Sequence, residues 1–127
     1  MNQRQAILGG AILGLAGVAL GAFGAHALKA LLTANGRLET YDLAVRYQFY
    51  HAFSLLIIGS FEEKIKSPGL RWASLFMFTG VVLFSGSLYG FALTNLTGFA
   101  IITPFGGLLM LMGWAALTYS IFSKKWN

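Results

Sequence analysis

The chain has 127 residues, of which 57% are hydrophobic and only 10% are charged, and its mean hydropathy is +0.69. In a soluble domain about a quarter of the residues are normally charged, so the few charged residues here cannot cover the surface of a small soluble protein. The net charge of +5 comes from basic residues that flank hydrophobic runs, which argues against nucleic-acid binding. The chain has no cysteine, which excludes disulfides and thiolate chemistry. The composition therefore predicts an integral membrane protein.

Four apolar segments are long enough to cross a membrane, because a helix needs about 20 mostly apolar residues to do so. In chain order we expect these spans near residues 6–28, 41–61, 72–93 and 104–122. The connections LTANGRLE and EEKIKSPGLR have the composition of turns, and TNLTGFAIIT is an uncharged connection. Thr103-Pro104 predicts an N-cap followed by proline in the first helical turn. We therefore predict a single domain over residues 1–127, an all-α, four-helix transmembrane bundle.

The first span also has features of a signal peptide. Arg4 supplies a basic start, and Ala25-His26-Ala27 fits a small-residue cleavage site. The apolar run is longer than the hydrophobic region of a usual signal peptide, so we expect the segment to be retained as a span.

The distribution of lysine and arginine predicts the orientation. With four spans, the N-terminus, the second connection and the C-terminus share one side, which carries Arg4, Lys64, Lys66, Arg71, Lys124 and Lys125. The other side carries Lys29 and Arg37, with Arg46 just inside the membrane. Cytoplasmic loops are enriched in lysine and arginine, so both termini are expected to be cytoplasmic in a multi-pass protein of the cytoplasmic (inner) membrane. Trp72 and Trp126 then lie at the cytoplasmic interface.

Glycines in the first span recur at intervals of four and three residues, at Gly10, Gly14, Gly17, Gly21 and Gly24. This period of 3.5 residues places them along one narrow line of the helix, the glycine seam. Glycine in a soluble helix costs about 1 kcal/mol relative to alanine, but in lipid it permits close contact between helices. We expect the seam to pack against another helix. A smooth wall for a lipid tail and an oligomer interface are the alternatives.

The second span begins with the polar stretch YDLAVRYQFYHAF. At a rise of about 1.5 Å per residue from Phe61, His51 lies roughly 15 Å deep, Arg46 roughly 22 Å and Asp42 roughly 28 Å. Arg46 can therefore reach the outer interface or pair with Asp42, four residues away, without any function. His51 lies near the midplane and should face the bundle interior, where a structural hydrogen bond is the simplest role. Its candidate partners are Tyr47, Ser54, Ser85, Ser87 and Tyr89, and proton transfer or ligand contact is the alternative.

Metal and catalytic chemistry have little support in the sequence. His26 lies roughly 30 Å from the cytoplasmic end of its span, a depth closer to that of Asp42 than to that of His51, so the two histidines should not share a metal. No hydrolase elbow, zinc-protease motif, P-loop or dinucleotide fingerprint occurs. Ser54 lies near His51 but has no acidic or amide partner at that depth. We expect no metal, no cofactor and no catalytic residue.

Two motifs resemble a known family: LGAFGAHAL, at residues 20–28, and AVRYQFYHAFSLLIIG, at residues 44–59. Together with the four-span layout they are similar to the domain-of-unknown-function 423 family, whose bacterial members are called YgdD-like or YwdK-like. Ala27 stands where glycine would be expected. The resemblance implies a fold and a membrane location but no reaction. The motif residues present here, where a site would be sought, are Gly21, Gly24, His26, Arg46, Tyr47, Gln48 and His51.

The sequence supports three functional hypotheses. The first is a non-enzymatic, lipid-interacting or accessory protein with a polar cluster of His26, Asp42, Arg46 and Tyr47 near the outer surface. Arg46, His26 and Lys29 would attract an anionic headgroup there. The second is a small-solute or proton transporter that uses His51, and the third, ranked last, is a membrane-embedded enzyme. Membrane lipids, a second copy of the chain or another membrane protein are the expected partners.

Overall fold

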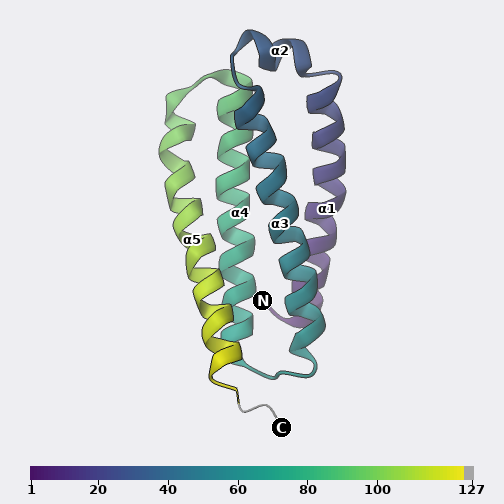
Figure 1. Cartoon of the computed structure of the whole chain (residues 1–127), viewed down its shortest axis with the longest axis vertical. Coiled ribbons are helices and arrows are strands. Elements are labelled where there is room, and N and C mark those ends of the chain that lie inside the picture. Colours follow the sequence, from purple (N-terminus) through teal and green to yellow (C-terminus); the bar gives the residue numbers. More distant parts are fainter. Residues whose placement is uncertain (125–127) are drawn as a thin grey trace.

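The computed structural model describes residues 1–124 and is helical throughout (Figure 1). Its helices are α1 (Gln3–Ala25), α2 (Lys29–Ala34), α3 (Leu38–Glu62), α4 (Pro68–Thr94) and α5 (Thr97–Phe122), and residues 1–124 contain no strand. Three of them, α1, α4 and α5, are long and apolar enough to cross a membrane. The mean hydropathy of α3 is lower than that of these three helices because its first half is polar. Lys125 and Trp126, which entered the predicted topology, lie outside the described residues.

The long helices lie side by side in an open row rather than around a closed core. α1 packs on α3, α3 on α4, and α4 on α5, while α1 makes only slight contact with α4. Within residues 1–124, α5 contacts neither α1 nor α3 along its backbone. The amino terminus, the α3–α4 connection and the end of α5 lie at one end of the molecule, and α2 lies at the other (Figure 1).

The last helix begins much earlier than the sequence predicted. α5 starts at Thr97, so TNLTGFAIIT is mostly helical and the prediction of a connection there is wrong. Only Asn95 and Leu96 separate α4 from α5. Asn95 adopts the left-handed conformation, with φ 56°, and its backbone N–H closes the last turn of α4. Asparagine is one of the few residues that tolerate this conformation, which explains the sharp turn.

Pro104 lies inside α5 and not in its first turn, so Thr103 is not an N-cap. Proline removes one backbone donor, but membrane helices tolerate it when hydroxyl side chains and neighbouring helices compensate. Next to the proline, the Thr103 hydroxyl lies 2.7 Å from the Ser87 hydroxyl of α4 and donates to the carbonyl of Phe99 at 3.3 Å, a carbonyl other than the one that Pro104 leaves without its helical donor. This contact fixes α5 to α4 at the level of the proline.

The connection between the first two spans contains a helix that the sequence did not predict. α1 ends at Ala25, a few residues before the predicted limit, and α2 begins at Lys29 and ends at Ala34, inside LTANGRLE. Leu32 of α2 is fully buried against Tyr41 and Ala92, so this short helix covers the end of the core. The Asn35 side chain donates to the carbonyl of Ala92 at 3.0 Å, which ties the connection to α4.

Three of the five seam glycines bring α1 close to α3. A Cβ atom at Gly10 would lie 2.7 Å from the carbonyl oxygen of Ala52, one at Gly17 would lie 2.9 Å from the Phe49 ring, and one at Gly24 would meet the Tyr41 ring. Gly21 is in ordinary contact with α3, but Gly14 has open space around it. Gly10, Gly17 and Gly24 are spaced by seven residues, which keeps them near one line of α1 that faces α3. The close contact predicted for all five glycines of the seam therefore occurs at only three of them.

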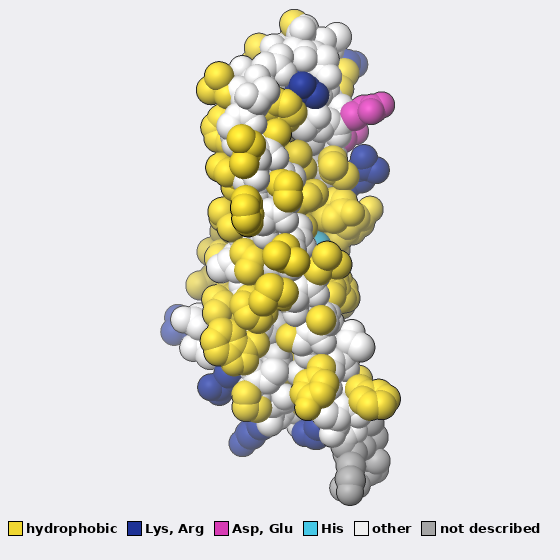
Figure 2. Space-filling model, turned by 90° about the vertical axis from the view of Figure 1, so that its left-hand side faces the viewer, with side chains coloured by type: hydrophobic (Ala, Val, Ile, Leu, Met, Phe, Trp, Pro, Cys, Tyr) yellow, Lys and Arg dark blue, Asp and Glu magenta, His cyan; other side chains and the backbone are white. Residues whose placement is uncertain are grey.

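The outer surface has the character of a lipid-facing protein. Large hydrophobic side chains are exposed on every long helix, for example Leu15, Phe53, Trp72, Ile101 and Leu111. Figure 2 shows hydrophobic side chains over the middle of one face, with most Lys and Arg side chains toward the two ends. This distribution matches a hydrocarbon environment around the middle of the helices.

Candidate functional site

Gln48, in the polar stretch of α3, joins three helices. It is buried, its Nε2 donates to the carbonyl of Leu13 on α1 at 2.8 Å, and its Oε1 accepts from the Tyr89 hydroxyl of α4 at 2.6 Å. A buried amide left without partners costs about 1–3 kcal/mol, so these bonds favour one arrangement of the helices. The geometry gives Gln48 a structural role.

Two further hydrogen bonds connect the same half of α3 to its neighbours. The Tyr41 hydroxyl donates to the carbonyl of Leu20 on α1, and its ring packs edge-on against Tyr89 with centroids 5.0 Å apart. The Ser85 hydroxyl of α4 donates to the carbonyl of Ala44 at 2.7 Å. Tyr41, Gln48 and Ser85 therefore bond to neighbouring helices and are buried.

Both ring nitrogens of His51 have partners. Nδ1 lies 2.8 Å from the carbonyl oxygen of Tyr47, and Nε2 lies 3.2 Å from Nε1 of Trp114 on α5. An indole nitrogen only donates and a carbonyl only accepts, so this pattern requires a neutral imidazole with its proton on Nδ1. His51 is buried, and this geometry satisfies it within the protein.

Trp114 is a partner that the sequence analysis missed. Of the predicted candidates, only Tyr47 bonds to His51, through its backbone carbonyl. The four other candidate side chains bond elsewhere: Ser54 to Tyr50, Ser85 to Ala44, Ser87 to Phe84 and Thr103, and Tyr89 to Gln48. One signal was available, because Trp114 lies well inside the last span, away from the interface where tryptophan is common.

A groove runs between α3 and α5, with α4 as its floor; we call it the lateral groove. Its middle hollow, of about 650 Å³, is lined by Tyr47, His51, Phe84, Pro104, Gly107, Leu108, Met110, Leu111 and Trp114. A hollow of about 430 Å³ adjoins it through Phe84 and Pro104, toward Thr40. A smaller one of about 170 Å³ adjoins it through Trp114, toward Phe61. The lining is mostly apolar, and the His51–Trp114 bond joins its two walls.

The residues of the predicted outer cluster differ in exposure. His26, Asp42 and Arg46 are exposed, whereas Tyr47 is half-buried against the Phe84 ring, with centroids 4.8 Å apart. Among residues 1–124, Asp42 and Arg46 form no ion pair, so Arg46 remains available to a ligand. The same residues contain no group of three or more His, Asp or Glu side chains that could hold a metal.

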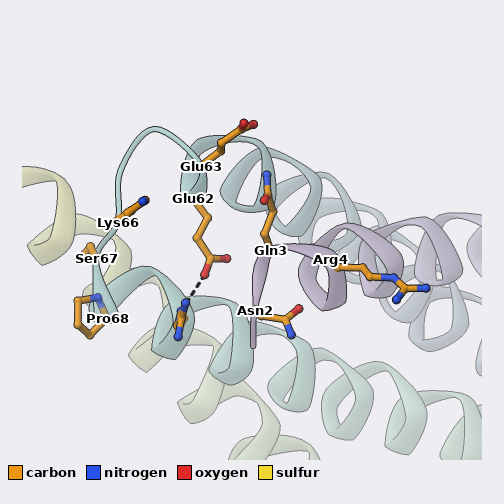
Figure 3. Close-up of a pocket in the computed structure, with 9 residues that line it drawn as sticks. Asn2, Gln3, Arg4, Glu62, Glu63, Lys66, Ser67 and Pro68 are labelled. Carbon is orange, nitrogen blue, oxygen red and sulfur yellow. Dashed lines mark hydrogen bonds and ion pairs between the residues drawn. The ribbon is translucent and has the colours of Figure 1, made fainter.

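A polar cavity at the other end of the molecule was also missed (Figure 3). Its volume is about 700 Å³, and it lies where α3 ends, α4 begins and the amino terminus returns to α4. Glu62 is buried in its wall and pairs with Arg71, whose Nε lies 3.0 Å from Oε1. Burial lowers the pKa of the Met1 α-amino group nearby; Arg71 adds to this effect and Glu62 opposes it. Of the charged residues in this cavity, Arg4, Lys66 and Arg71 served only to predict the orientation, and the burial of Glu62 was not predicted.

Comparison with known proteins identifies the family. The family described as "Protein of unknown function (DUF423)" matches residues 20–107, which is more than half of the chain and includes both motifs. The chain belongs to the DUF423 family. A UPF0382 membrane protein of Staphylococcus haemolyticus is 43% identical over 91% of this chain and 93% of its own length. The UPF0382 inner membrane protein YgdD of Escherichia coli K12 is 40% identical over 98% of this chain and 95% of its own. No solved structure matches the chain.

The family resemblance seen in the sequence is therefore confirmed, and this DUF423 chain is a membrane protein. Neither the family description nor these relatives' names state a reaction, a ligand or a partner. Three features of the structure bear on function: the lateral groove, the exposed Arg46 and the polar cavity.

Proposed function

We propose that this protein is a four-helix, multi-pass protein of the cytoplasmic membrane that binds lipid without catalysing a reaction. The first support is that α3 behaves as a fourth span. Its 25 residues reach about 37 Å at 1.5 Å per residue, enough to cross the hydrocarbon core. Its polar side chains Tyr41, Gln48 and His51 bond to other helices, which removes most of the cost of placing them in lipid.

The orientation that we propose places both termini in the cytoplasm. The end of the molecule with the amino terminus and the α3–α4 connection carries Arg4, Lys64, Lys66 and Arg71, whereas the α2 end carries Lys29 and Arg37. An excess of basic residues is typical of the cytoplasmic side. The name of the Escherichia coli relative, an inner membrane protein, agrees with the choice of membrane.

The lateral groove is the observation that carries the lipid proposal. α3 and α5 make no backbone contact and flank α4, so the lateral groove is a series of mostly apolar hollows that follow one another along the helices and open sideways. Its three hollows adjoin through shared residues, and its length follows the direction of lipid tails in a bilayer. The pairing of His51 with Trp114 leaves little polar surface in the walls. An acyl chain is the occupant that fits this shape and polarity.

A substitution that fills the groove tests this role. Gly107 lines the middle hollow, and a Cβ atom there would meet nothing closer than the Phe84 ring at 3.9 Å, so Gly107→Leu should fold with the hollow filled. Gly86 on α4 faces open space outside the groove, which makes Gly86→Leu the matched control. Native mass spectrometry after gentle extraction should show severalfold less bound lipid for Gly107→Leu and none of this loss for Gly86→Leu. Equal lipid on both variants would contradict the proposal.

Arg46 offers a second test, for the anionic headgroup proposed at the outer surface with His26 and Lys29. Arg46 is exposed on α3 and pairs with no carboxylate in residues 1–124. Arg46→Ala should therefore keep its stability and lose a defined anionic lipid or small anion in the same spectra. Identical spectra for wild type and variant would exclude this headgroup site, and the polar stretch would then have a structural role.

Transport of a proton or small solute through His51 is the second candidate function, because His51 lines the lateral groove. Transport requires neutral His51 to break at least one of the hydrogen bonds to its two ring nitrogens. A proton flux into liposomes that wild type shows and His51→Phe lacks would support this function. A membrane-embedded enzyme ranks last. An assembly of several copies, or one with another membrane protein, is compatible with each of these functions.

A further inference from the structure

The polar cavity has a charge composition that the lateral groove lacks. Its lining contains the cations Arg4, Lys66 and Arg71 and the carboxylates Glu62 and Glu63, with Asn2, Gln3, Ser67 and Pro68 completing it. An anion alone would be repelled by the carboxylates, and a simple cation would be repelled by the basic groups. A ligand that matches this lining carries both charges.

Glu62 provides the negative half of the site. The residue is only 6% exposed, and Oε1 accepts from Arg71, but Oε2 is buried without a hydrogen-bond partner among the described residues. Figure 3 shows the carboxylate directed between the amino-terminal segment and α4, whereas Glu63 points away from this space. Buried carboxylate oxygens are normally hydrogen-bonded, so Oε2 can accept a hydrogen bond from a ligand once a neighbouring side chain has moved aside. Gln3, beside Glu62 in Figure 3, is the lining side chain that would move aside.

Arg71 provides the positive half. Its bond to Glu62 uses Nε, and its side chain is 66% exposed, so most of the guanidinium is open to a ligand. Lys66 and Arg4 are also exposed on the lining. Arginine binds phosphate through its planar set of N–H donors, and lysine adds a point charge. A phosphate beside Arg71 would therefore lie within reach of an ammonium group at Glu62.

An apolar surface continues from the polar cavity. A second cavity, of about 290 Å³, shares Pro68 and Arg71 with it and is otherwise lined by Met1, Trp72 and Leu75. The Trp72 side chain is 56% exposed and stacks on Phe76 with ring centroids 5.6 Å apart. Tryptophan is enriched where headgroups meet hydrocarbon, so this path leads from the interface toward the acyl chains. A ligand that fits both cavities is amphipathic.

We propose that the polar cavity binds the phosphoethanolamine headgroup of a membrane lipid. The primary ammonium donates to Oε2 of Glu62, and the phosphate accepts from Arg71, with Lys66 and Arg4 beside it. The acyl chains pass along Trp72 and Leu75. This site lies at the opposite end from Arg46 and does not depend on lipid in the lateral groove.

Competition between two lipids tests the proposal. The full-length protein in detergent is offered equal amounts of phosphatidylethanolamine and phosphatidylcholine with the same acyl chains, and bound lipid is read by native mass spectrometry. Both lipids carry the phosphate and a positive charge, but only the ethanolamine has N–H donors. We expect wild type to prefer phosphatidylethanolamine about tenfold, equivalent to about 1.4 kcal/mol. Glu62→Gln keeps the side chain's shape and should bring the ratio close to one, whereas the neighbouring Glu63→Gln should keep the preference.

Equal binding of the two lipids by wild type, or an unchanged preference in Glu62→Gln, would overturn the proposal. If Glu62→Gln does not fold, wild type alone still decides: successive N-methylation of the headgroup should lower binding stepwise, and a flat series would refute the role of Glu62. Soluble phosphoethanolamine serves as a further competitor. Displacement of the lipid at equal concentration would assign the site to a soluble ligand and refute the lipid; failure to displace it supports the lipid.

Discussion

Replacing Trp114 with phenylalanine removes the donor of the hydrogen bond that joins α3 to α5. His51 is buried, and its Nε2 lies 3.2 Å from the indole nitrogen, so Trp114→Phe leaves an acceptor unpaired in an apolar site. Hydrogen bonds between membrane helices contribute about 0.6 kcal/mol on average and up to about 1.7 kcal/mol in double-mutant cycles. We expect a value near 1 kcal/mol here, because Trp114 is an unambiguous donor and α3 and α5 have few other contacts.

The assay is a double-mutant cycle on the free energy of unfolding in mixed detergent. Trp114→Phe, His51→Phe and the double variant are compared with wild type, and the coupling energy isolates the bond from the lost ring area. The control pair is Trp72→Phe with His51→Phe. Trp72 lies near the start of α4, next to Arg71, and far along the molecule from His51. A coupling below about 0.3 kcal/mol, within the error of additivity, would refute the bond. Equal coupling in both pairs would show a global effect instead.

Two further predictions concern helix packing, and a third concerns the orientation in the membrane. Gln48→Leu should lower the free energy of unfolding by about 1–3 kcal/mol, because it leaves the Tyr89 hydroxyl without its buried acceptor. Gly106→Ala should lower it by about 1–3 kcal/mol, because the new Cβ would meet backbone of α4, whereas Gly98→Ala, with open space, should not. The chain lacks cysteine, so single cysteines report topology: a membrane-impermeant thiol reagent outside cells should label Thr33→Cys and spare Lys64→Cys. The reverse labelling would invert the proposed orientation.

The class of the protein was predictable, but the helix neighbours were not. Low charge and long apolar runs follow directly from composition, and a buried polar stretch in a span had to find partners. Which partner each group finds was not encoded in any periodic pattern. Lipid tails are as apolar as leucine, so the side of a membrane helix that meets another helix carries little hydrophobic signal. Trp114 as the partner of His51, and the open row of helices, therefore required the three-dimensional structure.

The errors at Pro104 and in the polar cavity have different physical origins. Proline was taken as the start of a helix, a rule from soluble proteins that membrane helices relax because neighbouring hydroxyl groups compensate. Glu62 was treated as one charge of a cytoplasmic connection. Its burial depends on the amino terminus folding back onto α4, where the Met1 nitrogen donates to the carbonyl of Arg71 at 2.8 Å. No local pattern in the sequence predicts that contact.

The two motifs that carry the family resemblance both lie in the packed interface between α1 and α3. Gly24 lies against Tyr41, the Leu20 carbonyl accepts from the Tyr41 hydroxyl, and Gln48 bonds across to α1. The side chains of Gln48, His51 and Ser54 in the second motif are thus already hydrogen-bonded within the protein. A ligand must therefore use what packing leaves free. Arg46 is exposed on α3, the lateral groove is open to one side, and Oε2 of Glu62 is buried but accepts no hydrogen bond within residues 1–124.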